Sequence, residues 1–261
     1  MINPVAIQVG PLAIRWYGIF VALGFLGGYV LAIHRAKKRG VPAEAVSDVL
    51  FWTMAAGVTG ARLFYVIQNW EEQFAGGPWL EVLRVDHGGL VFYGGFFGAM
   101  AAVTLLVKIK KLNIWTIGDI LAPCVPLGQA FGRVGCLLNG CCHGHPCSGA
   151  FAMRYPLHPA GSFTAFPIQA FYSLSNLSLV AFVLICEKIF GLRGRLFGLF
   201  MIGYGLNRFF LEFGRGDYGP DAGIGPFTPA QVLCLIVIPA GVAVMWFGGR
   251  SAPAPAKEIH E

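Results

Sequence analysis

Seven long apolar segments dominate this chain of 261 residues and constrain its fold more than any other feature. A transmembrane helix needs about 20 mostly apolar residues to cross the hydrocarbon core of a bilayer. Hydrophobic residues make up 56% of the chain and charged residues 12%, roughly half the charged share of an ordinary soluble domain. We therefore predict an all-α integral membrane protein with about seven transmembrane helices. The predicted spans are residues 13–34, 46–68, 88–107, 114–131, 167–190, 195–213 and 228–248.

The chain is predicted to hold one membrane domain, residues 1–250, followed by a disordered cytoplasmic tail, residues 251–261. Its longest non-spanning stretch is 132–166, rich in Gly, Pro, Cys and His. A shorter one, 69–87, carries Trp70 and Trp79 and is typical of an amphipathic piece at the membrane interface. The first span is followed at once by basic residues rather than by a cleavage site, so we expect a retained helix.

The basic residues predict the orientation of the chain, because cytoplasmic loops carry an excess of Lys and Arg. Every lysine falls on one side, in the loops that follow the first, third and fifth spans and in the tail. We therefore expect a multi-pass protein with its N-terminus outside and its C-terminus in the cytoplasm. A net charge of +6 distributed in this way favours membrane topology over nucleic-acid binding.

The opposite side carries arginines and no lysine. Arginine binds phosphate and carboxylate groups through two parallel hydrogen bonds, which lysine cannot do. The arginines on that side thus favour anion recognition. The alternative is that lysines gather inside for topology while arginines are scattered.

Arg133 is the arginine in the most informative setting. It stands among glycines in the stretch Gly132–Gly140, and no carboxylate lies between Asp119 and Glu187 to neutralise it. A guanidinium flanked by glycines at a membrane border suits the binding of a lipid phosphate.

Ionisable residues inside spans are costly and each needs a reason. Arg62 lies among small residues that let a lipid head group or another helix approach. Asp119 is a candidate helix cap. Arg208 and Glu212 are four residues apart and share a helix face, as a structural ion pair or as part of a site. Asn207, Arg215 and Asp217 beside them favour the site.

The entrance of the third span holds Tyr93 beside the pair Gly94 and Gly95. Paired glycines permit close backbone approach to a head group. A belt tyrosine with packing glycines is the simpler alternative.

Four cysteines gather in the outer stretch with His143 and His145: Cys136, Cys141, Cys142 and Cys147. Their spacing matches no common zinc motif, and two adjacent cysteines strain to bind one metal. Small structural residues, a disulfide from Cys141 or Cys142 to Cys147, a metal site and a catalytic role all remain open.

Together these motifs resemble the prolipoprotein diacylglyceryl transferase family along nearly the whole chain. The most specific stretch is residues 128–140, Gly-Gln-Ala-Phe-Gly-Arg-Val-Gly-Cys-Leu-Leu-Asn-Gly. Six further matches, in order, are Gly10–Gly18, Gly60–Tyr65, Gly88–Gly95, Gly118–Pro123, Pro167–Gln169 and Gly203–Phe213.

The resemblance implies a transferase of lipoprotein biosynthesis in a bacterial inner membrane, with no metal and no organic cofactor. Such enzymes move the diacylglyceryl group of phosphatidylglycerol to the lipobox cysteine of a prolipoprotein and release glycerol-1-phosphate, at a site towards the periplasm. It implies that Arg133 binds the phosphate, with help from Arg208. Glu212 would orient Arg208 or accept the thiol proton, and Tyr93 would donate to the phosphate or assist with the proton. Tyr17, Arg62, Asn139, Gly94 and Gly95 would line the head-group pocket.

The chain departs from the family pattern in places. Tyr93 stands where some members have histidine, and Cys141 where some have glutamate. The family stretch His-Pro-x-Gln-Leu-Tyr-Glu reads Phe166–Tyr172 here, without the histidine and the acid. The alternative is a divergent paralogue that binds or transports lipid without the transfer. Another is a membrane thiol or metal enzyme built on the cysteines.

Overall fold

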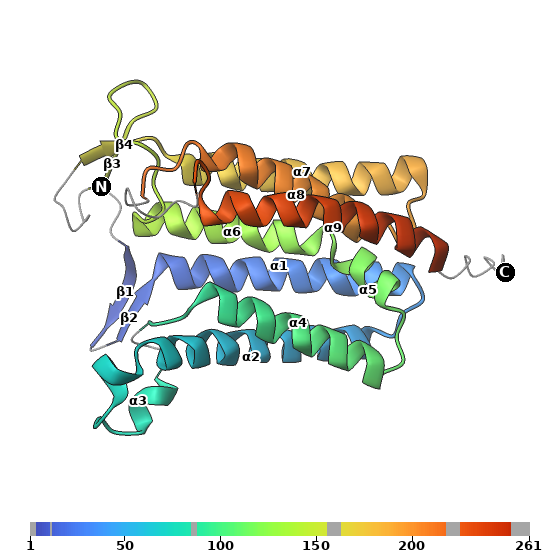
Figure 1. The fold of residues 1–261 in the computed structure, drawn as a ribbon, viewed down its shortest axis with the longest axis horizontal. Helices are drawn as coiled ribbons and strands as arrows, with labels where there is room; N and C mark the ends of the chain where they lie inside the picture. The colour runs from blue at the N-terminus through green and yellow to red at the C-terminus, as the bar shows by residue number, and fades with distance from the viewer. Residues whose placement is uncertain (1–3, 11, 85–87, 156–162, 218–224, 252–261) are drawn as a thin grey trace. The chain divides into compact units, whose positions relative to one another are not determined.

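The computed structural model describes residues 4–10, 12–84, 88–155, 163–217 and 225–251. They belong to two compact units, one of residues 1–32 and 118–261 and the other of residues 33–117. Helices dominate both units (Figure 1), and six helical segments of the described chain are long and apolar enough to cross a membrane. Those segments are Trp16–Lys38, Ala43–Gln68, Phe92–Ile109, Ile114–Asn139, Ile168–Phe190 and Pro229–Arg250. The prediction of an all-α membrane protein is confirmed.

The sixth predicted span, 195–213, is also helical but shorter than the six segments named above. It forms α8 (Leu196–Glu212), whose 17 residues extend about 26 Å at about 1.5 Å per residue. Its N-terminus is capped by Asp119, whose carboxylate is buried and accepts hydrogen bonds from the amides of Gly194 and Leu196. The predicted capping role of Asp119 is confirmed, although the capped helix is not its own.

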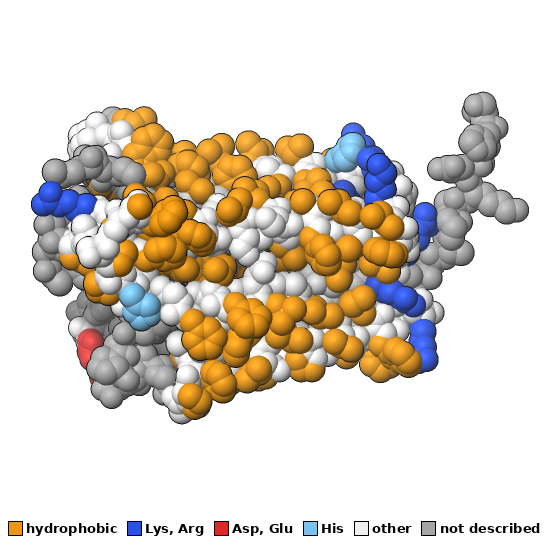
Figure 2. All heavy atoms as spheres, turned by 90° about the horizontal axis from the view of Figure 1, so that it is seen from above, with side chains coloured by type: hydrophobic (Ala, Val, Ile, Leu, Met, Phe, Trp, Pro, Cys, Tyr) orange, Lys and Arg blue, Asp and Glu red, His pale blue; other side chains and the backbone are white. Residues whose placement is uncertain are grey.

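Large apolar side chains remain exposed along the helices, as expected of surfaces that face lipid. Leu26 and Val30 on α1 (Trp16–Lys38) are more than half exposed, and so is Ile189 on α7 (Ile168–Phe190). On the face seen in Figure 2, hydrophobic side chains cover the helices and Lys and Arg side chains lie towards the helix ends. These helices would not be stable against water with such surfaces, so the composition and the fold agree.

The first unit holds the N-terminal part of α1 with α6 (Cys124–Asn139), α7, α8 and α9 (Pro229–Ser251). Its core is an apolar cluster in which Leu179 and Val183 of α7 meet Leu196 and Phe200 of α8. Close approach of α1 and α6 depends on Gly24, because a Cβ built there would lie 2.9 Å from the carbonyl oxygen of Gly128. Small residues at such contacts are typical of packed transmembrane helices.

The fourth predicted span, 114–131, differs from the structure. It is divided into α5 (Ile114–Leu121) and α6, and α6 continues to Asn139. Pro123 lies at the break and lacks the amide that an uninterrupted helix needs there. Gly140, at φ 74°, ends α6 in the left-handed conformation. As a result Arg133 lies inside a helix, and the loop that follows α6 begins at residue 140 rather than at 132.

The second unit is built on the pair α2 (Ala43–Gln68) and α4 (Phe92–Ile109). Gly60 of α2 and Gly94 of α4 are in backbone contact, since a Cβ on either would collide with the other's carbonyl oxygen. The predicted amphipathic loop contains a π-helical turn, η1 (Trp70–Phe74), and α3 (Leu80–Leu83). The rings of Trp70 and Trp79 lie 5.9 Å apart there.

Two short antiparallel hairpins were not expected from the sequence. They pair β1 (Val5–Val9) with β2 (Leu12–Arg15) and β3 (Met153–Tyr155) with β4 (Phe163–Ala165). Strands of three to five residues carry too little periodicity to be recognised beside long apolar helices. The predicted tail, 251–261, lies outside the described residues except for Ser251 at the end of α9.

Candidate active site

Arg133 projects from the middle of α6 and makes no hydrogen bond or ion pair with any residue that the structure describes. Its guanidinium carbon lies 4.6 Å from the centre of the Tyr172 ring on α7, a cation–π contact. A Cβ at Gly132 would meet nothing within 4 Å, so the backbone before Arg133 is open. The hydrogen-bond donors of Arg133 are therefore available to a ligand.

Arg208 approaches the same aromatic ring from α8, with its guanidinium carbon 5.1 Å from the ring centre. One of its terminal nitrogens, Nη2, pairs with Oε2 of Glu212 at 3.1 Å. The other, Nη1, is buried and has no hydrogen-bond partner among the described atoms. Gln129, one turn before Arg133 on α6, has a buried Oε1 in the same condition. Unpaired buried donors and acceptors are costly and often mark the place of a polar ligand.

Glu212 is held on several sides and its side chain has no exposed surface. Oε2 accepts a hydrogen bond of 2.8 Å from the hydroxyl of Tyr172 and pairs with Arg208. Oε1 accepts from Thr228 at 3.3 Å and lies 3.7 Å from Nη1 of Arg215. A carboxylate so enclosed is suited to hold its neighbours in place.

Thr228 belongs to a capping box at the start of α9. Its hydroxyl accepts from the amide of Gln231 at 3.2 Å, and Oε1 of Gln231 accepts from the amide of Thr228 at 2.9 Å. Pro229 between them takes the first helical position, where a missing amide does no harm. The cap thus brings the N-terminus of α9 to Glu212.

Tyr172 is the central residue of this arrangement, and it was not among the residues predicted from the sequence. It contacts both guanidinium groups and donates to Glu212, so it joins α6, α7 and α8. Tyr172 stands at the last position of the altered stretch Phe166–Tyr172, where the family pattern has its acid. The replacement of the family's acid by tyrosine was the feature of the sequence that could have indicated Tyr172.

Tyr17 and Asn139 lie in the same unit as Arg133. Tyr17, in the first turn of α1, packs against α6 where a Cβ on Gly135 would lie 3.2 Å from the Cα and Cδ2 atoms of Tyr17. Asn139 is the last residue of α6, and its side chain hydrogen-bonds Cys141. Both residues therefore stay candidates for the predicted pocket around Arg133.

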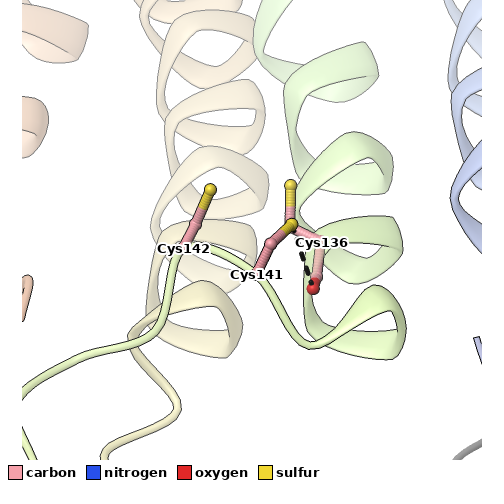
Figure 3. A group of neighbouring side chains, drawn as sticks. All are labelled: Cys136, Cys141 and Cys142. Atoms are coloured by element: carbon pink, nitrogen blue, oxygen red, sulfur yellow. Dashed lines mark hydrogen bonds between the residues drawn. The ribbon is translucent and has the colours of Figure 1, made fainter. Parts of the chain in front are cut away.

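Three of the four clustered cysteines converge at the C-terminal end of α6 (Figure 3). The Sγ atoms of Cys136, Cys141 and Cys142 all lie within 4.8 Å of one another, and all three residues are free thiols. Hydrogen bonds from the thiols of Cys136 and Cys142 and from Asn139 lower the pKa of the Cys141 thiol well below its ordinary value. We call these three residues the thiol cluster.

The remaining residues of the loop point elsewhere. Nδ1 of His143 is 3.0 Å from the carbonyl oxygen of Gly144, and Nε2 of His145 is 3.2 Å from that of Phe213. Cys147 is a free thiol outside the thiol cluster. The structure therefore groups Cys141 and Cys142 with Cys136 rather than with the proposed disulfide partner Cys147.

Arg62 was predicted to line the head-group pocket, but the structure commits it to the backbone of its own unit. Its guanidinium donates to the carbonyl oxygens of Glu81, Val82, Gly88 and Gly89 at 2.6–3.2 Å. The side chain is buried beside the rings of Tyr65 and Phe74. These four hydrogen bonds stabilise the loop between α2 and α4, and they leave Arg62 few hydrogen-bond donors for a lipid.

Gly94 and Gly95 were also predicted to bind substrate, and they too serve packing. Gly94 is in backbone contact with Gly60, a Cβ on Gly95 would lie 3.2 Å from the oxygen of Gly57, and the Gly95 amide donates to Val91. Tyr93 differs from them: it is 45% exposed, in the first turn of α4. Its hydroxyl stays a candidate for substrate contact.

Comparison with known proteins agrees with the motifs. The family model described as prolipoprotein diacylglyceryl transferase matches residues 4–247. The chain belongs to this family. It is 35% identical to the phosphatidylglycerol–prolipoprotein diacylglyceryl transferase of Rhodospirillum rubrum over 97% of this chain and 94% of that protein. Proteins of the same name from Listeria monocytogenes serotype 4a and Halalkalibacterium halodurans are each 31% identical, over 94% and 95% of this chain and 89% and 88% of theirs.

Proposed function

We propose that this protein transfers the diacylglyceryl group of phosphatidylglycerol to the lipobox cysteine of prolipoproteins. The names of its relatives support the reaction class. The observation that carries the proposal is that the guanidinium groups of Arg133 and Arg208 both contact the ring of Tyr172. Arg133 has no polar partner among the described residues, and Nη1 of Arg208 is buried and unpaired. Such a pair fits the phosphate of a lipid head group.

In the proposed reaction the acceptor sulfur forms a bond to the glycerol carbon of the diacylglyceryl group. The bond between that carbon and the phosphate oxygen breaks, and its electron pair leaves with glycerol-1-phosphate. Negative charge grows on the phosphate as this bond breaks. Arg133 and Arg208 would stabilise that charge, because both are oriented before the reaction begins.

The thiol of the acceptor must lose its proton to attack well. Glu212 is poorly suited to take it, since its side chain is enclosed by Tyr172, Arg208, Arg215 and Thr228. We assign Glu212 the role of holding Arg208. The positive field of Arg133 and Arg208 favours the thiolate form of the acceptor. The proton-transfer role of Tyr93 stays a prediction from the sequence.

The proposed site faces the periplasm from a bacterial inner membrane. Arg193 and Arg195 precede α8 and Glu212 ends it, so the site and this basic loop lie at opposite ends of one helix. With the basic loops in the cytoplasm, the N-terminus is outside and the C-terminus inside. This placement suits an acceptor that is secreted.

The test is a transfer assay with purified protein, phosphatidylglycerol vesicles and a lipobox peptide. Mass spectrometry of the peptide is expected to show one diacylglyceryl adduct, and the solution should contain released glycerol-1-phosphate in equal amount. A peptide with serine in place of cysteine should gain no adduct. Bound phosphatidylglycerol without any adduct would contradict the transferase and favour a lipid-binding paralogue.

A further inference from the structure

The thiol cluster is a feature that the proposed transfer does not use. Cys136 is on the last turns of α6, and Cys141 and Cys142 are on the loop that follows. The three sulfur atoms lie on the same side of that loop in Figure 3. Arg133 precedes Cys136 by three residues on the same helix, which places the cluster beside the candidate active site.

The end of α6 explains how the first two sulfurs meet. The amide of Cys141 donates to the carbonyl oxygen of Cys136 at 3.2 Å, and the amide of Gly140 donates to that of Leu137 at 3.2 Å. This is the Schellman pattern, with Gly140 left-handed, and it characteristically brings the side chains of these two positions into contact. Here both positions are cysteine.

Cys142 joins them through an uncommon backbone conformation. Its φ is 60°, and it is one of two described non-glycine residues with a positive value. Such a conformation is strained for a residue with a side chain and persists where the surrounding structure determines it. With this conformation the side chains of the adjacent residues Cys141 and Cys142 can both point towards one metal ion. The loop is also anchored from α7, because Nε2 of the buried Gln169 donates to the carbonyl oxygen of Cys141 at 2.7 Å.

We propose that Cys136, Cys141 and Cys142 bind one thiophilic d10 cation, Zn²⁺ or Cu⁺. Thiolates are the ligands that select these ions. A metal with bonds of about 2.3 Å to sulfur sets its ligands about 3.8–4.0 Å apart, so sulfurs within 4.8 Å need to close by no more than about 1 Å. For Zn²⁺ a fourth position stays open for water or for a ligand outside the cluster.

The first test measures metal binding directly. Reduced protein is equilibrated with Zn²⁺, with Cu⁺ under a competing chelator, or with Cd²⁺ as an optical probe, and bound metal is counted by mass spectrometry. We expect one ion per chain, with sulfur-to-metal charge transfer for Cd²⁺, and the Zn²⁺ and Cu⁺ arms identify the preferred ion. Failure to retain any of the three ions would overturn the proposal.

Variants then assign the ligands. Cys136→Ser, Cys141→Ser and Cys142→Ser should each weaken binding at least about tenfold, whereas Cys147→Ser, from the same loop, should leave it unchanged. In the unmodified chain, bound metal should protect the three cluster thiols from alkylation and leave Cys147 reactive. Equal affinity in all four variants, or cluster thiols that bound metal leaves open to alkylation, would contradict the site.

Discussion

The hydroxyl of Tyr172 donates to Oε2 of Glu212 across 2.8 Å while its ring contacts the guanidinium groups of Arg133 and Arg208. One side chain thus links the two proposed phosphate ligands to the carboxylate that holds one of them. Tyr172→Phe keeps the ring and loses the hydrogen bond. We expect a loss of about tenfold in kcat/KM, equivalent to about 1.4 kcal/mol. Tyr172→Leu, which also removes the cation–π contacts, should lose more, and equal rates for the two variants would contradict the role of the ring.

Glu212 should act by position rather than as a base. Glu212→Gln keeps the size and one acceptor oxygen, so we expect reduced turnover with an unchanged shape of the pH–rate profile. Glu212→Ala leaves Arg208 buried without its partner and should cost about 3–5 kcal/mol of stability. Initial rates across pH and thermal unfolding measure the two effects. Loss of one limb of the pH profile in Glu212→Gln would assign the base to Glu212 instead.

The two glycines that flank Arg133 should respond differently to a methyl group. In Gly135→Ala the new Cβ lies 3.2 Å from the Cα of Tyr17, so α1 must move. We expect about 1–3 kcal/mol lower stability and slower transfer. Gly132→Ala meets nothing within 4 Å and serves as the matched control. Thermal unfolding of both variants checks this, and equal stability would count against close packing of α1 on α6.

Arg62→Lys should destabilise the loop between α2 and α4 without altering substrate chemistry. A lysine cannot reproduce the fork that reaches four carbonyl oxygens, and we expect a loss of about 2 kcal/mol. Arg84→Lys is the control, because Arg84 pairs with Glu81 at a partly exposed site. Limited proteolysis of the segment 69–91 should be faster in Arg62→Lys alone. A variant with normal stability and weaker lipid binding would restore Arg62 to the head-group pocket.

The membrane fold could be predicted because length and apolarity suffice to identify spanning helices. The break at Pro123 was missed because the apolar run continues through it, and the hairpins because their strands are too short. For the site, the sequence indicated Arg133, Arg208 and Glu212 through charge in apolar surroundings. It could not show that the donors of Arg62 meet carbonyl groups, or that Tyr172 lies between two arginines, since both depend on contacts between distant residues.

The central claim is that Arg133 binds the phosphate of the lipid donor through its guanidinium fork. The most direct measurement compares Arg133→Lys with Arg193→Lys, an exposed arginine in the loop before α8, in the peptide-transfer assay. We predict that Arg133→Lys loses at least about 100-fold in kcat while remaining folded, and that Arg193→Lys keeps its activity. Near-normal turnover by Arg133→Lys would contradict the account.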